Sequence, residues 1–179
     1  MSSEPAKAAV VTRLSCSGCG AEARPDDPLP FRCPRATGGD TDHILRRTIV
    51  SANPEGWKSI FMDPEPNPFV RYRALLHSHA TAMSRGMSDE QFVALVRRLD
   101  AAVAAVDGTG FIETPLIPLP MRGPELTLLV KDETGNVSGS HKGRHLFGLL
   151  LWLEVARATG MLDDRPLRLA IASCGNAAL

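Results

Sequence analysis

Residues 142–159 constrain the fold more than any other part of the sequence, because they form a long helical run with almost no polar face. The run is KGRHLFGLLLWLEVARAT, and Gly160 follows it as a residue suited to the left-handed backbone that ends many helices. A helix that is apolar nearly all round has to be buried on several sides. The sequence therefore predicts a buried helix over residues 142–159.

Two short apolar runs flank this helix and have the length of buried strands. They are residues 126–130 (LTLLV) and residues 167–172 (LRLAIA). Strand, loop, helix and strand in this order make a βαβ unit, whose strands run parallel with a right-handed crossover. Strands without polar alternation also indicate burial on both faces. We therefore expect an α/β fold built on a parallel sheet.

The rest of the chain predicts two more helices and an irregular N-terminal segment. Residues 69–86 predict one helix that ends at Gly86, and Ser88 begins the next with a capping box in which Gln91 reaches back. Apolar residues then recur at helical spacing until Gly108. Residues 1–68, rich in Pro, Gly, Asp and Arg, predict loops and short strands. We divide the chain into the irregular segment 1–68 and the start of an α/β region, 69–179.

Composition and charge exclude several classes of function. Twenty basic residues balance twenty acidic ones, so the chain has no electrostatic footprint for nucleic acid or an anionic membrane surface. Its longest apolar run, residues 146–153, is far shorter than the roughly 20 residues that span a bilayer. The N-terminus has no apolar segment typical of a signal peptide. We expect a cytoplasmic protein with reduced cysteines.

A cysteine pattern in the N-terminal segment resembles half of a zinc ribbon. Cys16 and Cys19 are separated by two residues, and Cys33 follows before a proline. A tetrahedral site needs a fourth ligand, but the natural place for it after Cys33 is occupied by Arg35 and then Ala36. His43 could substitute only at an irregular spacing. We expect a metal-free remnant of such a knuckle and no bound metal.

Two polar loops follow the predicted strands and would meet at one rim of the sheet, where open parallel sheets bind ligands. The first, residues 131–142, ends on Lys142, and the second is the turn at residues 173–176. Lys142 suits Schiff-base chemistry, because a helix N-terminus, nearby Arg144 and the apolar helix disfavour the ammonium. The alternative is an ordinary solvated lysine. A P-loop is excluded, because the spacing of Gly135, Gly139 and Lys142 does not fit it.

The second turn also allows two interpretations. Ser173, Gly175 and Asn176 lead into a predicted helix start at Ala177, where free backbone N–H groups suit a carboxylate or phosphate. The alternative is a tight strand-to-helix turn in which Asn176 is the N-cap.

The two loops together carry a resemblance to a known family. KDETGNVSGSHKGRH followed by ASCGNAA resembles the fold type II pyridoxal-phosphate enzymes, which include threonine synthase, threonine dehydratase, cysteine synthase and the tryptophan synthase β chain. NPFVRYRALL and GFIETPLIPL are most similar to the threonine-synthase-like branch. The matching positions are Lys131, Glu133, Asn136, Ser138, Gly139, Ser140, Lys142, Ser173, Gly175 and Asn176.

This resemblance implies a fold and a set of residue roles. The fold would be the three-layer parallel sheet of the tryptophan synthase β-like type, incomplete in this chain. Lys142 would bind the aldehyde of pyridoxal 5′-phosphate covalently and later act as the acid–base at the substrate α-carbon, and Asn176 would hydrogen-bond the pyridine 3′-oxygen. The turn that grips the substrate carboxylate would consist of Ser173, Cys174, Gly175, Asn176 and Ala177.

The resemblance also implies an activity. It predicts a lyase that eliminates or replaces a β- or γ-substituent of a small amino-acid substrate, with no nucleic-acid or membrane partner and with a homodimeric full-length protein. Because the family's phosphate-binding loop comes later in the chain, we expect an N-terminal fragment that is inactive alone. The alternative is a non-catalytic remnant or a regulatory homologue of the same fold.

Overall fold

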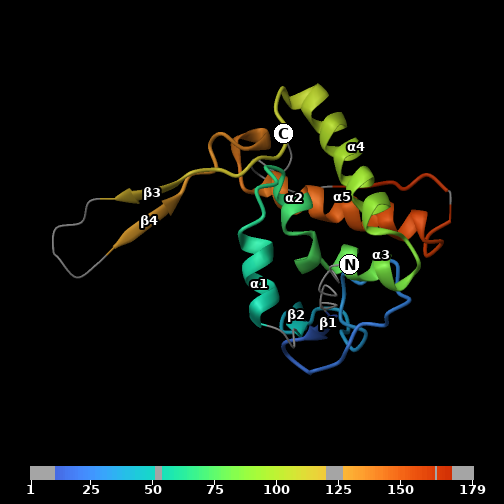
Figure 1. Cartoon of the computed structure of the whole chain (residues 1–179). Coiled ribbons are helices and arrows are strands. Elements are labelled where there is room, and N and C mark those ends of the chain that lie inside the picture. The colour runs from blue at the N-terminus through green and yellow to red at the C-terminus, as the bar shows by residue number, and fades with distance from the viewer. Residues whose placement is uncertain (1–10, 51–53, 120–126, 164, 171–179) are drawn as a thin grey trace.

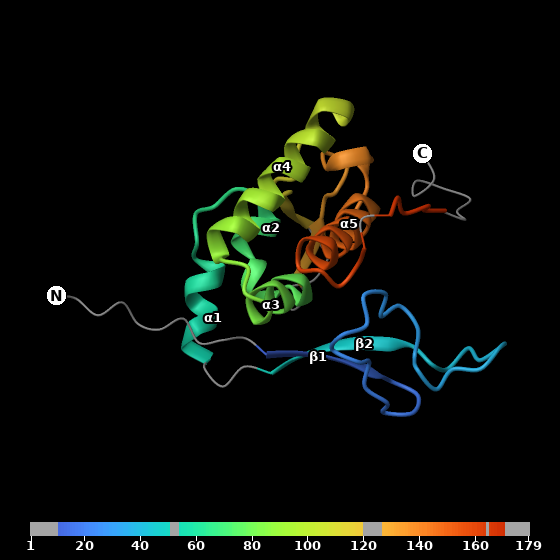
Figure 2. The same cartoon turned by 90° about the vertical axis from the view of Figure 1, so that its right-hand side faces the viewer.

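The described part of the chain combines helices with two small antiparallel sheets. The computed structural model describes residues 11–50, 54–119, 127–163 and 165–170. Helices α3, α4 and α5 pack together, the β1–β2 pair lies beside them, and the β3–β4 hairpin projects away from the helices (Figures 1 and 2). The elements in chain order are β1 (Val11–Cys16), β2 (Leu45–Val50), α1 (Pro54–Phe61), α2 (Pro68–Arg71), α3 (His77–Ser84), α4 (Asp89–Asp107), β3 (Leu116–Leu119), β4 (Leu128–Lys131) and α5 (Lys142–Ala158), with 3-10 turns at Arg73–Leu75 and Val137–Gly139.

The hydrophobic core is built around α5. Phe147 on α5 meets Phe69 of α2 and Phe111 of the segment after α4, with ring centroids 4.5 and 4.7 Å away. Three successive residues of α5, Leu151 to Leu153, are all buried, so the helix is covered on more than one face. The predicted start and burial of this helix are confirmed, it ends at Ala158, one residue before the predicted end, and Gly160 adopts the expected left-handed backbone, with a φ of 72°.

The helix expected over residues 69–86 is wrong as a single element, because the chain breaks into α2, a 3-10 turn and α3. Asn67 caps α2 by accepting hydrogen bonds from the N–H groups of Phe69 and Val70. Arg73 then donates to the carbonyl of Val70 and pairs with Asp89 at the start of α4. These contacts of Arg73 stabilise the chain at the point where the predicted helix is interrupted.

The predicted start and end of α4 are confirmed. Ser88 Oγ accepts from Gln91 N at 3.2 Å, and Gln91 Oε1 accepts from Ser88 N at 2.8 Å. Gly108 ends the helix with a φ of 85°. This capping box requires contacts between neighbouring residues alone, and local sequence is sufficient to predict it.

The predicted parallel sheet is not found in the described parts of the chain. β4 lies where a strand was expected, but it pairs antiparallel with β3, with Leu116 opposite Lys131 and Leu119 opposite Leu128. Residues 167–170 are not in a strand, and residues 171–172 of the expected second strand lie outside the described residues. A hairpin satisfies the backbone groups of β4 from a segment close in sequence, so that no crossover connection is required.

The N-terminal segment has the expected loops and short strands, together with the helix α1, which was not expected. β1 and β2 form an antiparallel pair in which Cys16 lies opposite Leu45. Residues 17–44 form the long connection between these strands. In the described ranges, no helix has both the length and the apolar character needed to cross a membrane.

Candidate active site

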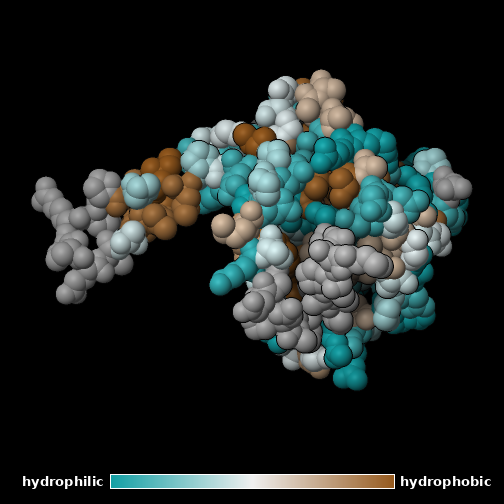
Figure 3. Space-filling view, viewed as in Figure 1, coloured by the Kyte–Doolittle hydropathy of each residue, from teal (hydrophilic) through white to brown (hydrophobic). Residues whose placement is uncertain are grey.

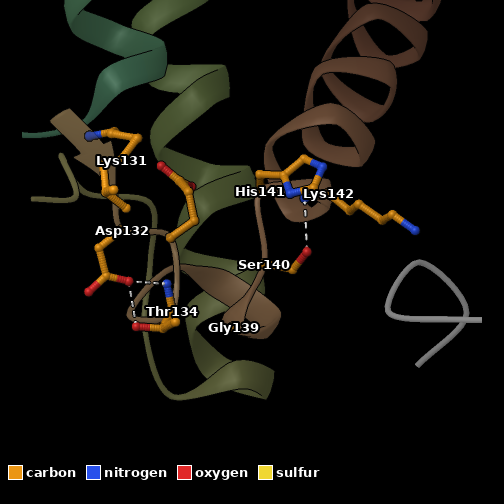
Figure 4. Close-up of a pocket in the computed structure, with 9 residues that line it drawn as sticks. Lys131, Asp132, Thr134, Gly139, Ser140, His141 and Lys142 are labelled. Carbon is orange, nitrogen blue, oxygen red and sulfur yellow. Dashed lines mark hydrogen bonds between the residues drawn. The ribbon is translucent and has the colours of Figure 1, made fainter. Parts of the chain in front are cut away.

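The loop from β4 to α5 is held by short-range hydrogen bonds of its own side chains. Asp132 Oδ1 accepts from Thr134 N at 2.9 Å and from Thr134 Oγ1 at 2.6 Å (Figure 4). Asn136, which is 3% exposed, donates from Nδ2 to the carbonyl of Ser140 at 2.8 Å. The buried amide thus closes the loop just before Lys142.

Small residues allow this loop to approach the helices closely. Ser138 and Gly139 both have left-handed backbones, with φ values of 57° and 59°. The N–H of Ser138 donates to Asp107 Oδ1 at the end of α4, at 3.0 Å. A Cβ on Gly143 would lie 2.9 Å from the carbonyl oxygen of Val137, so α5 and the loop touch through backbone atoms. These contacts explain several of the small residues in the sequence between Asn136 and Gly143.

Lys142 is the first residue of α5, and its backbone N–H donates to Ser140 Oγ at 3.2 Å. Its side chain extends away from Lys131, Asp132 and Thr134 (Figure 4). Together with residues 130–134 and 139–141 it lines an open pocket of about 560 Å³. Within the described residues, no carboxylate or carbonyl binds its ammonium. The amine of Lys142 is therefore available at the head of a buried helix.

Arg144 does not act on Lys142 as a free cation, which corrects the expectation from sequence. Its Nε donates to Glu133 Oε2 at 2.8 Å, and its Nη2 donates to the carbonyl of Ile112 at 2.9 Å. Burial opposes the ionisation of Glu133, but the hydrogen bonds from Arg144 and Thr114 outweigh it and hold the pKa of Glu133 below its ordinary value. The charge of Arg144 is therefore largely compensated.

Thr114 is a residue of this site that sequence reasoning missed. It is buried, its Oγ1 donates to Glu133 Oε1 at 2.5 Å, and its carbonyl accepts from the ammonium of Lys131. It thus connects the approach to β3 with the loop after β4. The sequence offers little sign of this role beyond a threonine before Pro115. The partners of Thr114 lie 17 or more residues further along the chain, so local sequence does not reveal them.

The second predicted loop lies outside the described residues. This holds for each of Ser173, Cys174, Gly175, Asn176 and Ala177. The convergence of Asn176 and Lys142 on one rim stays a prediction.

A second cluster of reactive side chains lies in the N-terminal segment. The ligand atoms of Cys16, Cys19, Cys33 and His43 all lie within 4.8 Å of one another. The expectation that these three cysteines lack a fourth ligand is therefore wrong. His43 lies 27 positions from Cys16, a spacing that matches no zinc-ribbon pattern. The fold of the long loop brings it to the cysteines, and the number of residues between them does not reveal this.

The pKa values of Cys16 and Cys33 are shifted in opposite directions. Burial disfavours the thiolate of Cys16, but hydrogen bonds from the backbone of Cys19 and Gly18 and from the other thiols outweigh it and lower the pKa of Cys16 to about 7. Burial raises the pKa of Cys33. The cluster therefore contains one thiol that ionises readily near neutral pH.

A scan against models of known protein families and searches of curated proteins and of solved structures each found no match to this chain.

Proposed function

We propose that the chain carries the lysine-bearing part of a pyridoxal-phosphate-dependent lyase, which acts on an amino acid by β- or γ-elimination or replacement and is similar to threonine synthase. The observation that supports this most directly is the position of Lys142. Its amine has no polar partner within the described ranges and stands at the first turn of a buried helix beside an open pocket.

The residues present fit one end of the cofactor. A lysine amine is the group that binds the cofactor aldehyde covalently, and Lys142 offers it without a competing carboxylate in the described part of the chain. Lys131, which lines the same pocket, is less suited, because its ammonium is bound to the carbonyl of Thr114. Contacts to the pyridine ring are proposed for Asn176, on the resemblance alone.

The roles of this chain's own residues follow from the loop geometry. Pyridoxal phosphate, when bound, supplies an electron sink for charge at the substrate α-carbon. Asn136 and Ser140 hold the backbone before Lys142 by hydrogen bonds, so that the Lys142 side chain starts from a fixed position. Lys142 would hold the cofactor and then move the proton at the α-carbon. The Glu133–Arg144 pair would keep the adjoining wall of the pocket fixed.

The test is to incubate the protein with pyridoxal phosphate, reduce it with borohydride and map the labelled peptide. The lysines of the sequence are Lys7, Lys58, Lys131 and Lys142. We expect the label on Lys142, its loss in Lys142→Met and its retention in Lys131→Met, the matched control from the same pocket. A label spread over all four lysines, or one that survives in Lys142→Met, would overturn the proposal. Labelling at Lys142 without turnover of amino acids would favour the non-catalytic homologue.

A further inference from the structure

The four residues of the cysteine–histidine cluster come from three separate parts of the N-terminal segment. Cys16 ends β1, Cys19 lies in the turn after it, Cys33 lies in the long loop, and His43 stands two residues before β2. The β1–β2 pairing brings the first and last of these together, with Ser17 N donating to the carbonyl of Ile44 at 2.8 Å. The two strands thus close the 28-residue loop between them. Cys16 and Cys19 at the start of this loop are brought close to His43 at its end.

The turn between Cys16 and Cys19 is shaped to direct both sulfurs to one point. Gly20 N donates to the carbonyl of Cys16 at 2.9 Å, with a φ of 71° at Gly20. A Cβ on Gly18 would lie 2.1 Å from the carbonyl oxygen of Asp42, so no other residue type fits there without a shift of the backbone. This close approach brings the residue before His43 against the cysteine turn.

Three distances between ligand atoms of the cluster are close to those of a tetrahedral zinc site. With zinc–sulfur bonds of about 2.3 Å and zinc–nitrogen bonds of about 2.0–2.1 Å, two sulfurs should lie about 3.8 Å apart and a sulfur and a nitrogen about 3.6 Å apart. Cys19 Sγ and Cys33 Sγ are 3.7 Å apart. His43 Nδ1 lies 3.7 Å from Cys16 Sγ and 3.3 Å from Cys33 Sγ. A disulfide would need a sulfur–sulfur distance of about 2.05 Å, so this arrangement is not an oxidised pair.

The surroundings of His43 also suit a metal ligand. Its other ring nitrogen, Nε2, lies 3.8 Å from Asp40 Oδ2. That carboxylate is fixed by two hydrogen bonds of 2.8 Å, from the N–H and the hydroxyl of Thr37. Metal-binding histidines commonly donate the second ring N–H to a carboxylate, which fixes the ring orientation and the tautomer. At 3.8 Å the Asp40 carboxylate faces this nitrogen but is not hydrogen-bonded to it. Cys33 Sγ accepts from the backbone N–H of Arg35 at 3.4 Å.

We propose that Cys16, Cys19, Cys33 and His43 bind one zinc ion in a closed, structural site. Three soft sulfurs and one imidazole in a tetrahedral arrangement favour zinc over calcium or magnesium, which take oxygen ligands. Because four protein side chains fill the coordination shell, the site has no open position for a substrate. The zinc ion cross-links the ends of β1 and β2 with the loop between them. This site is independent of the proposed lyase activity.

The first experiment measures metal in the whole chain, purified in the presence of zinc and then dialysed. We expect one zinc per chain by elemental analysis, lost in Cys33→Ser and in His43→Ala. Cys174→Ser and His145→Ala are the matched controls, because they remove a thiol or an imidazole far from the cluster in the sequence, and they should retain the metal. Full zinc content in Cys33→Ser, or loss of zinc in the two controls as well, would overturn the site.

A second measurement separates binding from a general failure to fold. Cobalt(II) bound to the wild-type chain should give the intense absorption of a tetrahedral thiolate site, and His43→Cys should keep that absorption with a shifted spectrum, because it replaces one good ligand by another. Asp40→Asn leaves all four ligands in place and should weaken zinc binding about 10- to 100-fold in competition with a chelating dye. Absence of both zinc and the cobalt thiolate absorption from the wild-type chain, or iron in place of zinc, would refute the proposal.

Discussion

Two glycines of α5 have opposite surroundings, and this difference can be tested at single positions. Gly143 faces the carbonyl oxygen of Val137, 2.9 Å from where a Cβ would lie, whereas Gly148 has no atom within 4 Å of that point. We expect Gly143→Ala to lower the free energy of unfolding by about 1–3 kcal/mol, because backbone atoms must move apart. Gly148→Ala should raise it by up to about 1 kcal/mol, because alanine favours a helix. Urea unfolding followed by circular dichroism compares the two, and equal effects would contradict the close packing of the loop.

Asp89 links α4 to the segment before it and predicts a dependence of stability on pH. The hydrogen bonds from Arg73 are the largest cause that holds its pKa below the ordinary value, and His79 adds another. A lowered folded pKa means that the ionised group stabilises the protein above the unfolded pKa of about 3.9 and that this stability is lost as the pH falls through the folded pKa. Because the Asp89 side chain is 39% exposed, solvent screening limits the effect to about 1 kcal/mol at pH 7.

The corresponding experiment compares Asp89→Asn with the wild-type chain by urea unfolding at several pH values. The difference in unfolding free energy should be largest near pH 7 and shrink below about pH 4, where the carboxyl of the unfolded chain takes up its proton. Asp26→Asn is the control, because the pair of Asp26 with Arg24 is exposed and screened. A difference that stays constant from pH 7 to pH 3 would show that the charge of Asp89 is not the cause.

At the scale of single residues, the sequence was informative where the determining contacts are local. Ser88, Gln91 and Gly108 were predicted because a helix cap depends on residues within one turn. The roles of His43 and Thr114 depend on distant residues, and local sequence does not reveal them. The cysteine partners of His43 are 10 and 27 positions away. The partners of Thr114 are 17 to 30 positions away. Lys142 at the head of α5 was predicted from its neighbours in sequence, but the direction of its side chain, away from Lys131 and Asp132, depends on the path of the chain.

At the scale of elements, apolar runs predicted where β4 and α5 lie but not how β4 pairs. The run at residues 126–130 has no period-2 alternation, which is typical of a strand covered on both faces. In the hairpin most of its residues are exposed, with β3 as the described partner. The sequence did not predict β3, because Pro115 and Pro118 lower the strand propensity of this segment. Proline has no backbone N–H to donate to a neighbouring strand. Pairing was therefore decided by chain proximity, which an apolar pattern does not encode.

The exposed hairpin predicts that the chain associates as its concentration rises. Both strands carry apolar side chains, which form a continuous hydrophobic surface on the projecting arm (Figure 3). Leu119 and Leu128 lie directly opposite each other and are 43% and 40% exposed. We expect sedimentation velocity to show association in the wild-type chain and less of it in the double variant Leu119→Lys, Leu128→Glu, whose opposite charges keep the cross-strand pair compatible.

A matched control separates this surface from apolar exposure in general. Val106, near the end of α4, is 91% exposed but isolated from the hairpin, and Val106→Lys should leave association unchanged. Equal suppression of association by Val106→Lys, or none by the hairpin variant, would show that another surface drives it.

At the scale of the whole molecule, the N-terminal segment is held against the helices by a small set of specific contacts. His77 of α3 hydrogen-bonds Thr12 Oγ1 of β1 through Nδ1 at 2.6 Å, and its ring stacks on Trp152 of α5 at 5.1 Å. The indole Nε1 of Trp152 donates to the carbonyl of Pro28 at 2.8 Å. Burial is the main cause that lowers the pKa of His77. β1 therefore attaches to α3 and the cysteine-bearing loop attaches to α5, and the stacked rings of His77 and Trp152 join these two helices.

The indole of Trp152 gives the sharpest test of this attachment. Trp152→Phe keeps an aromatic ring beside His77 but removes the donor to Pro28, which should cost about 1 kcal/mol of unfolding free energy. Loss of that hydrogen bond should release the loop first, so limited trypsin digestion should cut faster after Arg32 and Arg35 while cleavage in α4 and α5 changes little. Trp57→Phe in α1 is the control, since Trp57 stacks on Phe61 of its own helix and should leave cleavage in the loop unchanged. If Trp152→Phe accelerated cleavage evenly along the chain, the indole would be stabilising the core as a whole, and the loop would not be attached through this one hydrogen bond.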